Sequence, residues 1–152
     1  MPKLKFQISA PGNLEALFHG CRNVVDWPKF MPAVKVARFL EQEVDKDVVE
    51  LTAEVNETLW NWKSKRTIDI STHSIHFERL SLPENVLFMR GTWHVSAIDT
   101  DYSQLTLSHE FEVCEGHKQQ QDFIVRSIRR NSIRDICALF IFIGELEEKS
   151  DG

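Results

Sequence analysis

The hydrophobic pattern of the first thirty residues predicts one strand and two short helices. The segment KLKFQI at residues 3–8 alternates polar and apolar side chains, and this period of two is typical of a half-buried strand. Pro11-Gly12 ends the strand. Asn13 can cap a helix over residues 14–21, and a second short helix runs through Asp26-Trp27-Pro28.

The pattern changes between residues 33 and 113, where alternating segments rich in Val, Thr, Phe, Ile and Trp follow one another. Turn-prone residues separate these segments at 45–47, 83–85 and 99–101. The short connections leave no room for the crossover helices that a parallel sheet needs. This region therefore predicts five or six antiparallel strands.

After Gly116 the pattern is helical for about 30 residues. One apolar stripe of this helix consists of Ile124, Ile128, Ala138 and Phe142. The order of elements predicts an α+β domain, in which a curved antiparallel sheet of six to seven strands wraps around the C-terminal helix and encloses a cavity. Because 152 residues is the size of one compact domain, residues 1–152 are expected to fold as one unit.

Composition and charge narrow the functional classes. With 42% hydrophobic and 27% charged residues the chain is globular, and its net charge of -5 is the wrong sign for covering nucleic-acid phosphates. Three widely spaced cysteines predict neither a disulfide framework nor a zinc site. The N-terminus lacks an apolar signal region, and the apolar run at 136–144 is about half the length that spans a bilayer. We expect a cytoplasmic protein that binds neither nucleic acid nor membrane.

Strand parity gives segment 59–66 an unusual inner face. Successive strand side chains point to opposite faces, and Asn61, Lys63 and Lys65 mark the solvent side. Two indoles, a hydroxyl and a guanidinium are therefore predicted to point inward, namely Trp60, Trp62, Ser64 and Arg66. The alternative is that Arg66 lies at a strand end, where its stem covers apolar surface and its charge reaches water.

Other strands and the terminal helix add further inward groups. These groups are Phe77, Arg79, Met89, Trp93, His109 and Asn131. Gly91, on the face of Met89, is expected to leave space in the pocket. The alternatives are a satisfied core histidine for His109, a strand-end ion pair for Arg79 and a hydrogen bond to a loop for Asn131.

The inward polar groups predict a ligand pocket. Two Arg, a Ser, a His and an Asn are expensive to bury among aromatic rings without a function. The sequence contains no Gly-rich phosphate loop, nucleophile elbow, HExxH motif or cluster of metal-binding carboxylates. We therefore expect a cavity that works without cofactor or metal.

These residues resemble the polyketide aromatase/cyclases, single-domain members of the START-like (SRPBCC) helix-grip superfamily. The resemblance covers nearly the whole chain and is most specific in the Trp60-x-Trp62-x-Ser64-x-Arg66 strand. It also includes Trp27-Pro28, Trp93, Glu110-Phe111 and Asn131. A helix-grip topology alone does not identify an activity, so the Trp-x-Trp-x-Ser-x-Arg strand carries the resemblance.

The resemblance implies that a linear poly-β-ketone, tethered to an acyl carrier protein, undergoes regiospecific aldol cyclisation and dehydration in the cavity. Arg66 would stabilise the enolate or alkoxide, and Ser64 would position a carbonyl or relay a proton. His109, with an ordinary pKa of about 6.5, would be the acid or base. The residues expected to hold the bent substrate are Trp27, Met31, Trp60, Trp62, Phe77, Arg79, Met89, Trp93 and Asn131.

Two other functions fit the same fold. A non-catalytic lipid or quinone carrier would use the apolar cavity to hold and hand over its ligand, although the polar groups exceed what retention requires. A regulatory or chaperone-like interaction domain would use the apolar run at 136–143 to cover a partner. That partner includes a second copy of the chain, so a monomer and a homodimer both stay open.

Positive charge concentrates on the terminal helix of this otherwise acidic protein, at Arg126, Arg129, Arg130 and Arg134. Acyl carrier proteins are generally acidic, and complementary charge orients a docking partner. One hypothesis is therefore that this helix docks the carrier protein of a polyketide synthase. The alternative is a solvated helix face that pairs locally with Asp122 and Asp135.

Overall fold

The computed structural model describes residues 2–55 and 57–151. Its strands are β1 (Lys3–Pro11), β2 (Val34–Gln42), β3 (Lys46–Val55), β4 (Thr58–Asp69), β5 (Ser74–Arg79), β6 (Val86–Ala97) and β7 (Tyr102–Val113). Its helices are α1 (Leu14–Arg22), the 3-10 turn η1 (Val24–Asp26), α2 (Trp27–Phe30) and α3 (Lys118–Asp151). The predicted order of strand, short helices, strand series and long helix is confirmed.

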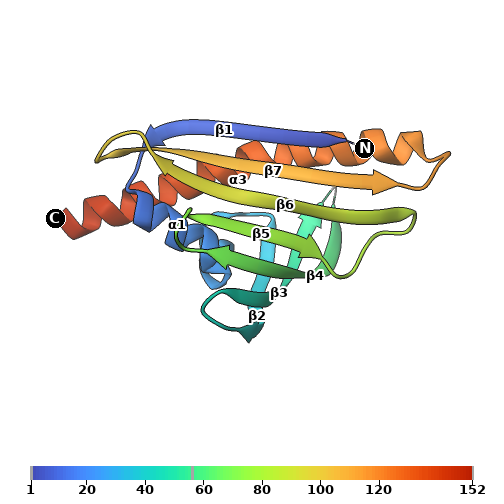
Figure 1. The fold of residues 1–152 in the computed structure, drawn as a ribbon, viewed down its shortest axis with the longest axis horizontal. Coiled ribbons are helices and arrows are strands. Elements are labelled where there is room, and N and C mark those ends of the chain that lie inside the picture. The colour runs from blue at the N-terminus through green and yellow to red at the C-terminus, as the bar shows by residue number, and fades with distance from the viewer. Residues whose placement is uncertain (1, 56, 152) are drawn as a thin grey trace.

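All strands belong to one antiparallel sheet with the order β1-β7-β6-β5-β4-β3-β2. Each strand from β2 to β7 pairs with its neighbour in sequence, and β1 joins the edge of β7. In Figure 1, α3 runs along β1 and β7 while the sheet curves away toward β2. The predicted α+β helix-grip architecture, a curved sheet around a C-terminal helix, is confirmed.

The start of α1 and its crossing with α3 follow from two local features. The Asn13 side chain accepts a 3.1 Å hydrogen bond from the Ala16 backbone N–H, which caps the first turn of α1. Gly20 lies where α1 meets α3, and a Cβ there would come within 2.6 Å of Leu139 Cδ1. A side chain at residue 20 would therefore force the Leu139 side chain to shift.

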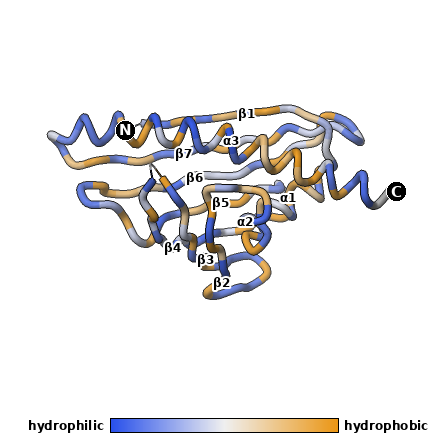
Figure 2. The backbone as a smooth tube through the Cα atoms, turned by 180° about the vertical axis from the view of Figure 1, so that it is seen from behind, coloured by the Kyte–Doolittle hydropathy of each residue, from blue (hydrophilic) through white to orange (hydrophobic). Residues whose placement is uncertain are grey.

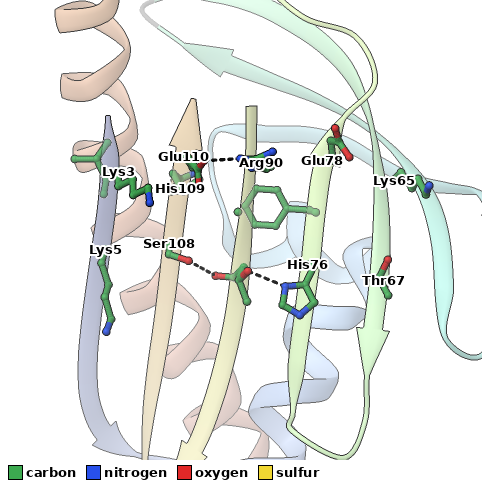
Figure 3. A pocket seen from close by; sticks show the side chains of 14 residues that line it. Lys3, Lys5, Lys65, Thr67, His76, Glu78, Arg90, Ser108, His109 and Glu110 are labelled. Atoms are coloured by element: carbon green, nitrogen blue, oxygen red, sulfur yellow. Dashed lines mark hydrogen bonds and ion pairs between the residues drawn. The ribbon is translucent and has the colours of Figure 1, made fainter. Parts of the chain in front are cut away.

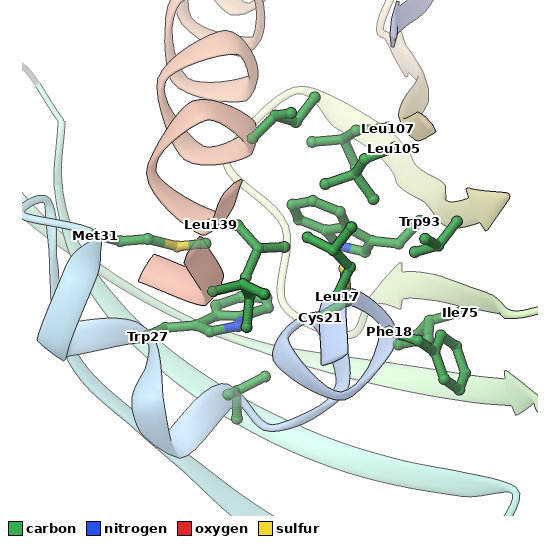
Figure 4. Close-up of a cluster of buried hydrophobic side chains, with 14 of the residues drawn as sticks. Leu17, Phe18, Cys21, Trp27, Met31, Ile75, Trp93, Leu105, Leu107 and Leu139 are labelled. Atoms are coloured by element: carbon green, nitrogen blue, oxygen red, sulfur yellow. The ribbon is translucent and has the colours of Figure 1, made fainter. Parts of the chain in front are cut away.

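The hydrophobic core lies at one end of the molecule, which we call the closed end. Here α1, α2 and residues 136–143 of α3 cover the sheet (Figure 4). Leu17 of α1 and Ile136 and Leu139 of α3 are fully buried. The opposite end, which we call the open end, lies between residues 120–135 of α3 and strands β3, β4 and β6, and it contains a cavity.

Candidate functional site

The register of the sheet arranges the inner side chains in three rows from the closed to the open end. The first row is apolar and consists of Ile68, Ile75, Trp93 and Leu107. The second row consists of Arg66, Phe77, Gly91 and His109. The third contains the cross-strand pairs Ser64–Arg79 and Met89–Phe111. Polar groups thus enter the inner face toward the open end.

The second and third rows border a cavity of about 410 Å³ between the sheet, α2 and α3. All the site residues expected from the sequence line it, namely Trp27, Met31, Trp60, Trp62, Ser64, Arg66, Phe77, Arg79, Met89, Trp93, His109 and Asn131. A pocket of this size suits a small organic ligand. The structure therefore brings the expected residues together, and their individual roles stay predictions.

The tryptophans differ in how firmly they are held. Trp27 is buried, its Nε1 donates a 2.9 Å hydrogen bond to the Gly20 carbonyl, and its ring lies 6.0 Å from that of Trp93. These two indoles form a fixed wall toward the closed end. Trp60 is 45% exposed, so it lies at the rim of the cavity.

Arg66 is buried, and most of its donors are occupied by the protein. Its Nε and Nη2 donate to the two carboxylate oxygens of Asp47, each at 2.8 Å. Nη1 and Nη2 also donate to the Cys21 and Arg22 carbonyls at 3.1 and 2.6 Å, which lie at the C-terminus of α1 where helix carbonyls lack partners. With 2% of its surface exposed, Arg66 does not reach water, so the strand-end alternative is wrong.

Arg79 is the less constrained guanidinium in the cavity. It lies over the Trp62 ring at 4.8 Å, and its Nε donates to the Ser81 carbonyl at 3.2 Å. Within the part of the chain that the structure describes, no carboxylate pairs with it, so the strand-end ion pair is not found. Desolvation lowers the pKa of Arg79 to about 10, which leaves it positively charged at neutral pH.

His109 differs from the sequence-based expectation in its ionisation. Its Nε2 lies 3.1 Å from Ser132 Oγ, and its ring meets Phe77 edge-on at 5.6 Å. Burial lowers its pKa to about 4. The imidazole is therefore neutral at pH 7 and can exchange hydrogen bonds, whereas an ordinary pKa near 6.5 was expected.

Sequence reasoning missed Asp135 and Ser132 as cavity-lining groups. Burial raises the pKa of Asp135 to about 6, against the opposing effect of the Arg134 guanidinium at 3.4 Å. The helical spacing could have identified Asp135 as a cavity residue, because it lies four residues after Asn131 and so on the same helix face. Of the local pairs in the solvated-face alternative, an Arg134–Asp135 pair is present, and no ion pair of Asp122 is found among the described residues.

Gly91 does not leave free space in the cavity. A Cβ at this position would overlap the Ser108 carbonyl oxygen and lie 2.5 Å from Phe77 Cζ. The Phe77 ring therefore fills the volume that a side chain at 91 would take. The expectation that Gly91 opens the pocket is wrong, because the neighbouring strand supplies an aromatic ring to the same spot.

A second hollow lies on the outer face of the sheet (Figure 3). Its floor carries hydroxyl and imidazole groups, including a 2.9 Å contact between His76 Nδ1 and Thr92 Oγ1. Lys3, Lys5 and Lys65 surround it, and Arg90 pairs with Glu110. This polar surface lacks the aromatic walls of the inner cavity, so the inner cavity is the candidate site.

No group of three or more His, Cys, Asp or Glu side chains in residues 2–55 and 57–151 is arranged to hold a metal ion. No helix in the described part of the chain is both long and apolar enough to cross a membrane.

The chain is similar in sequence to the granaticin polyketide synthase bifunctional cyclase/dehydratase of Streptomyces violaceoruber. The two are 30% identical over 126 residues, which are 82% of this chain and 39% of that protein. The chain thus spans well under half the length of this curated relative. No family model matches the sequence.

Solved structures show the same fold. The Zhui aromatase/cyclase from a Streptomyces species superimposes with a TM-score of 0.87 at 20% identity, covering 98% of this chain and 95% of that one. The di-domain aromatase/cyclase BexL gives a TM-score of 0.82 at 22% identity, covering 96% of this chain and 47% of that one. The chain therefore has the helix-grip fold of the START-like superfamily, and in sequence and fold it resembles the polyketide aromatase/cyclases.

Proposed function

We propose that this protein is a polyketide aromatase/cyclase, which closes a ring in a poly-β-ketone by aldol addition and then removes water. The observation that carries the proposal is the cavity itself, where aromatic walls surround a charged Arg79 that has no carboxylate partner among the described residues. Arg79 is partly buried, and a cation that has lost part of its water gains free energy when it meets an anion. A substrate whose carbonyl oxygen becomes negative during the reaction supplies that partner.

The aromatic walls of the cavity restrict the conformations of a flexible substrate. A linear poly-β-ketone has many rotatable bonds, and only bent conformations bring the reacting carbons together. Flat rings at Trp27, Trp62 and Trp93 restrict the chain to a fold that fits between them. Holding the reacting atoms in place in this way supplies much of the rate enhancement of a reaction that uses no cofactor.

The chemistry balances without an external oxidant or reductant. A base removes a proton from a methylene between two carbonyls, and the resulting enolate carbon bonds to a distant carbonyl carbon. The oxygen of that carbonyl takes a proton and becomes a hydroxyl. Loss of this hydroxyl with a neighbouring proton releases water, and enolisation of the remaining ring carbonyls gives the aromatic ring. We infer that the chain works without a cofactor.

Three side chains, Ser64, Arg66 and Arg79, donate hydrogen bonds that stabilise the substrate oxyanion. Ser64 and Arg79 are direct cross-strand neighbours, so hydroxyl and guanidinium can bind the same substrate oxygen. Arg66 keeps one Nη1 hydrogen after its four bonds to Asp47, Cys21 and Arg22. We assign Arg66 a donor role through that hydrogen, and we assign Arg79 the larger electrostatic role.

Two groups in the cavity wall, Asp135 of α3 and His109 of β7, are suited to proton transfer. Asp135 has a pKa of about 6, and an acid or base is most effective when its pKa lies near the working pH. His109, neutral and hydrogen-bonded to Ser132, relays a proton or orients a carbonyl. Asn131, one helical turn before Asp135, supplies an amide that orients the substrate.

The test is turnover of a carrier-tethered poly-β-ketone made by a reconstituted minimal polyketide synthase. Arg79→Gln is expected to lower the rate of aromatic product formation by about 100-fold, the cost of one oxyanion donor. Arg38→Gln is the matched control, because Arg38 is an exposed arginine on β2 that pairs with Glu50. Circular dichroism and urea unfolding establish that both variants are folded.

Two results would contradict the proposal. If the synthase makes the same products with and without the wild-type protein, the protein is not a cyclase. If such inactive protein instead binds a fatty acid or quinone in the cavity with micromolar or better affinity, the carrier function explains the fold. If Arg38→Gln loses as much activity as Arg79→Gln, the loss is not specific to the cavity, and Arg79 has no special role in the mechanism.

A further inference from the structure

The side of α3 that faces away from the sheet carries exposed apolar residues. Ile133 is 45% and Ile141 62% exposed, and Cys137 lies between them. These positions are four residues apart and therefore form a stripe along one side of the helix. The opposite side of the same turns is in the core, where Ile136 and Leu139 are fully buried. A helix that is apolar on two sides is normally covered on both.

Charge is distributed unequally along this stripe. Arg126 and Arg130 lie toward its N-terminal end, and Glu145 and Glu148 lie toward its C-terminal end. All four side chains are exposed, and within residues 2–55 and 57–151 none of them is in an ion pair. Figure 2 shows hydrophobic stretches between more hydrophilic ends of α3. We call residues 126–148 of this exposed side the α3 seam.

The α3 seam is complementary to itself when reversed. If a second copy lies antiparallel with Cys137 opposite Cys137, Ile133 of one copy lies level with Ile141 of the other. Arg126 then lies level with Glu148, and Arg130 lies within one residue, about 1.5 Å along the axis, of Glu145. Each Arg–Glu contact occurs twice, as a two-fold axis requires. Apolar residues thus meet at the centre and opposite charges meet at both ends.

We propose that the α3 seam binds the α3 seam of a second copy, giving an antiparallel homodimer with Cys137 on the two-fold axis. Gly144 lies on this side, and a Cβ there would meet nothing within 4 Å, so the helices can approach closely near the ends of the seam. The seam is about 33 Å long at 1.5 Å per residue. A single helix pair lies at the small end of stable interfaces, so the dimer is expected to dissociate on dilution.

The charge pattern favours a second copy over an acidic carrier protein. The arginines attract a carrier, but Glu145 and Glu148 toward the other end of the seam repel it. The dimer also leaves the cavity free, because Asn131 and Asp135 line it from the side of α3 turned away from the seam. The dimer proposal does not depend on the proposed activity.

The test is a charge exchange followed by sedimentation velocity over a range of concentrations. The acidic variant, Arg126→Glu with Arg130→Glu, and the basic variant, Glu145→Arg with Glu148→Arg, each place like charges opposite one another. Each is expected to self-associate at least about tenfold more weakly than wild type. An equimolar mixture restores opposite charges at both ends and is expected to form a heterodimer. The matched control is Lys3→Glu with Lys5→Glu on β1, which should dimerise like wild type.

A thiol-specific bismaleimide provides a second measurement. It is expected to cross-link wild-type protein and Cys114→Ser into dimers but to leave Cys137→Ser monomeric. A wild-type chain that stays monomeric at hundreds of micromolar, or a mixture of the two variants that forms no heterodimer, would overturn the proposal. If the wild type is monomeric and the acidic variant loses turnover of carrier-tethered substrate only, the seam is a carrier-docking surface instead.

Discussion

The closed and open ends of the molecule use the same sheet and the same helix for opposite purposes. At the closed end, Ile136 and Leu139 of α3 pack against α1 and the apolar first row of the sheet. One turn earlier, Asn131 and Asp135 of the same helix face the cavity. The change from filled core to cavity therefore takes place within about one helical turn.

This difference shows how the domain can hold a cavity without losing its stability. The closed end removes large apolar side chains from water and provides most of the hydrophobic free energy of folding. The open end forgoes part of this free energy to keep room for a ligand. Arg66 joins the two ends, because it binds Asp47 of β3 and the last carbonyls of α1.

The largest expected effect on stability comes from breaking that junction. Arg66→Ala leaves the Asp47 carboxylate buried without its partner, and we expect the free energy of unfolding to fall by about 3–5 kcal/mol. Urea unfolding followed by circular dichroism measures the loss. The exposed cross-strand pair Arg38–Glu50 is the matched control, and Arg38→Ala should cost less than about 1 kcal/mol.

The double variant Arg66→Ala with Asp47→Ala sharpens this prediction. It removes the unpaired charge, so it should be less destabilised than the sum of the two single variants. Additive effects, or a loss for Arg66→Ala no larger than that for Arg38→Ala, would show that the pair does not join the two ends. An inactive but fully stable Arg66→Ala protein would assign Arg66 to catalysis alone.

A matched pair of isoleucines on α3 compares the two ends directly. Ile136 is fully buried in the core, whereas Ile124 lines the cavity. Ile136→Ala creates a new void and should lower the free energy of unfolding by about 2–5 kcal/mol. Ile124→Ala only enlarges an existing space and should cost less than half as much. Equal losses in urea unfolding would mean that both ends are packed alike.

Much of the fold and the membership of the cavity were predictable, because they depend on local periodicity. The period of two placed Trp60, Trp62, Ser64 and Arg66 on one face without knowledge of the neighbouring strands. Contacts across strands were not predictable in this way. Asp47 meets Arg66 only through the β3–β4 register, and Phe77 fills the place beside Gly91 only through the β5–β6 register.

The pKa values of His109 and Asp135 could not be predicted from the sequence either. The pKa of His109 falls because burial removes water from the charged form, and the pKa of Asp135 rises for the same physical reason. Burial of a given side chain depends on how α3 lies against the sheet, which no local pattern determines. The helical spacing of Asn131 and Asp135 could have identified the residue but not its pKa.

The smallest expected effect concerns Asp135, at the boundary between the two ends. Its pKa of about 6 in the folded protein lies above the unfolded value of about 3.9. The folded state therefore binds this proton more tightly, and wild-type stability falls as pH rises from about 4 to about 6. Asp135→Asn removes the charge and should be more stable than wild type at pH 7.5 by about 1–2 kcal/mol, but not at pH 4.

His109 titrates in an overlapping range in both proteins, so the difference in stability between wild type and Asp135→Asn isolates the contribution of Asp135. Urea unfolding of both proteins at pH 4.0 and 7.5 measures it, and a difference that does not change with pH would mean that Asp135 is solvated and belongs to neither the core nor the cavity.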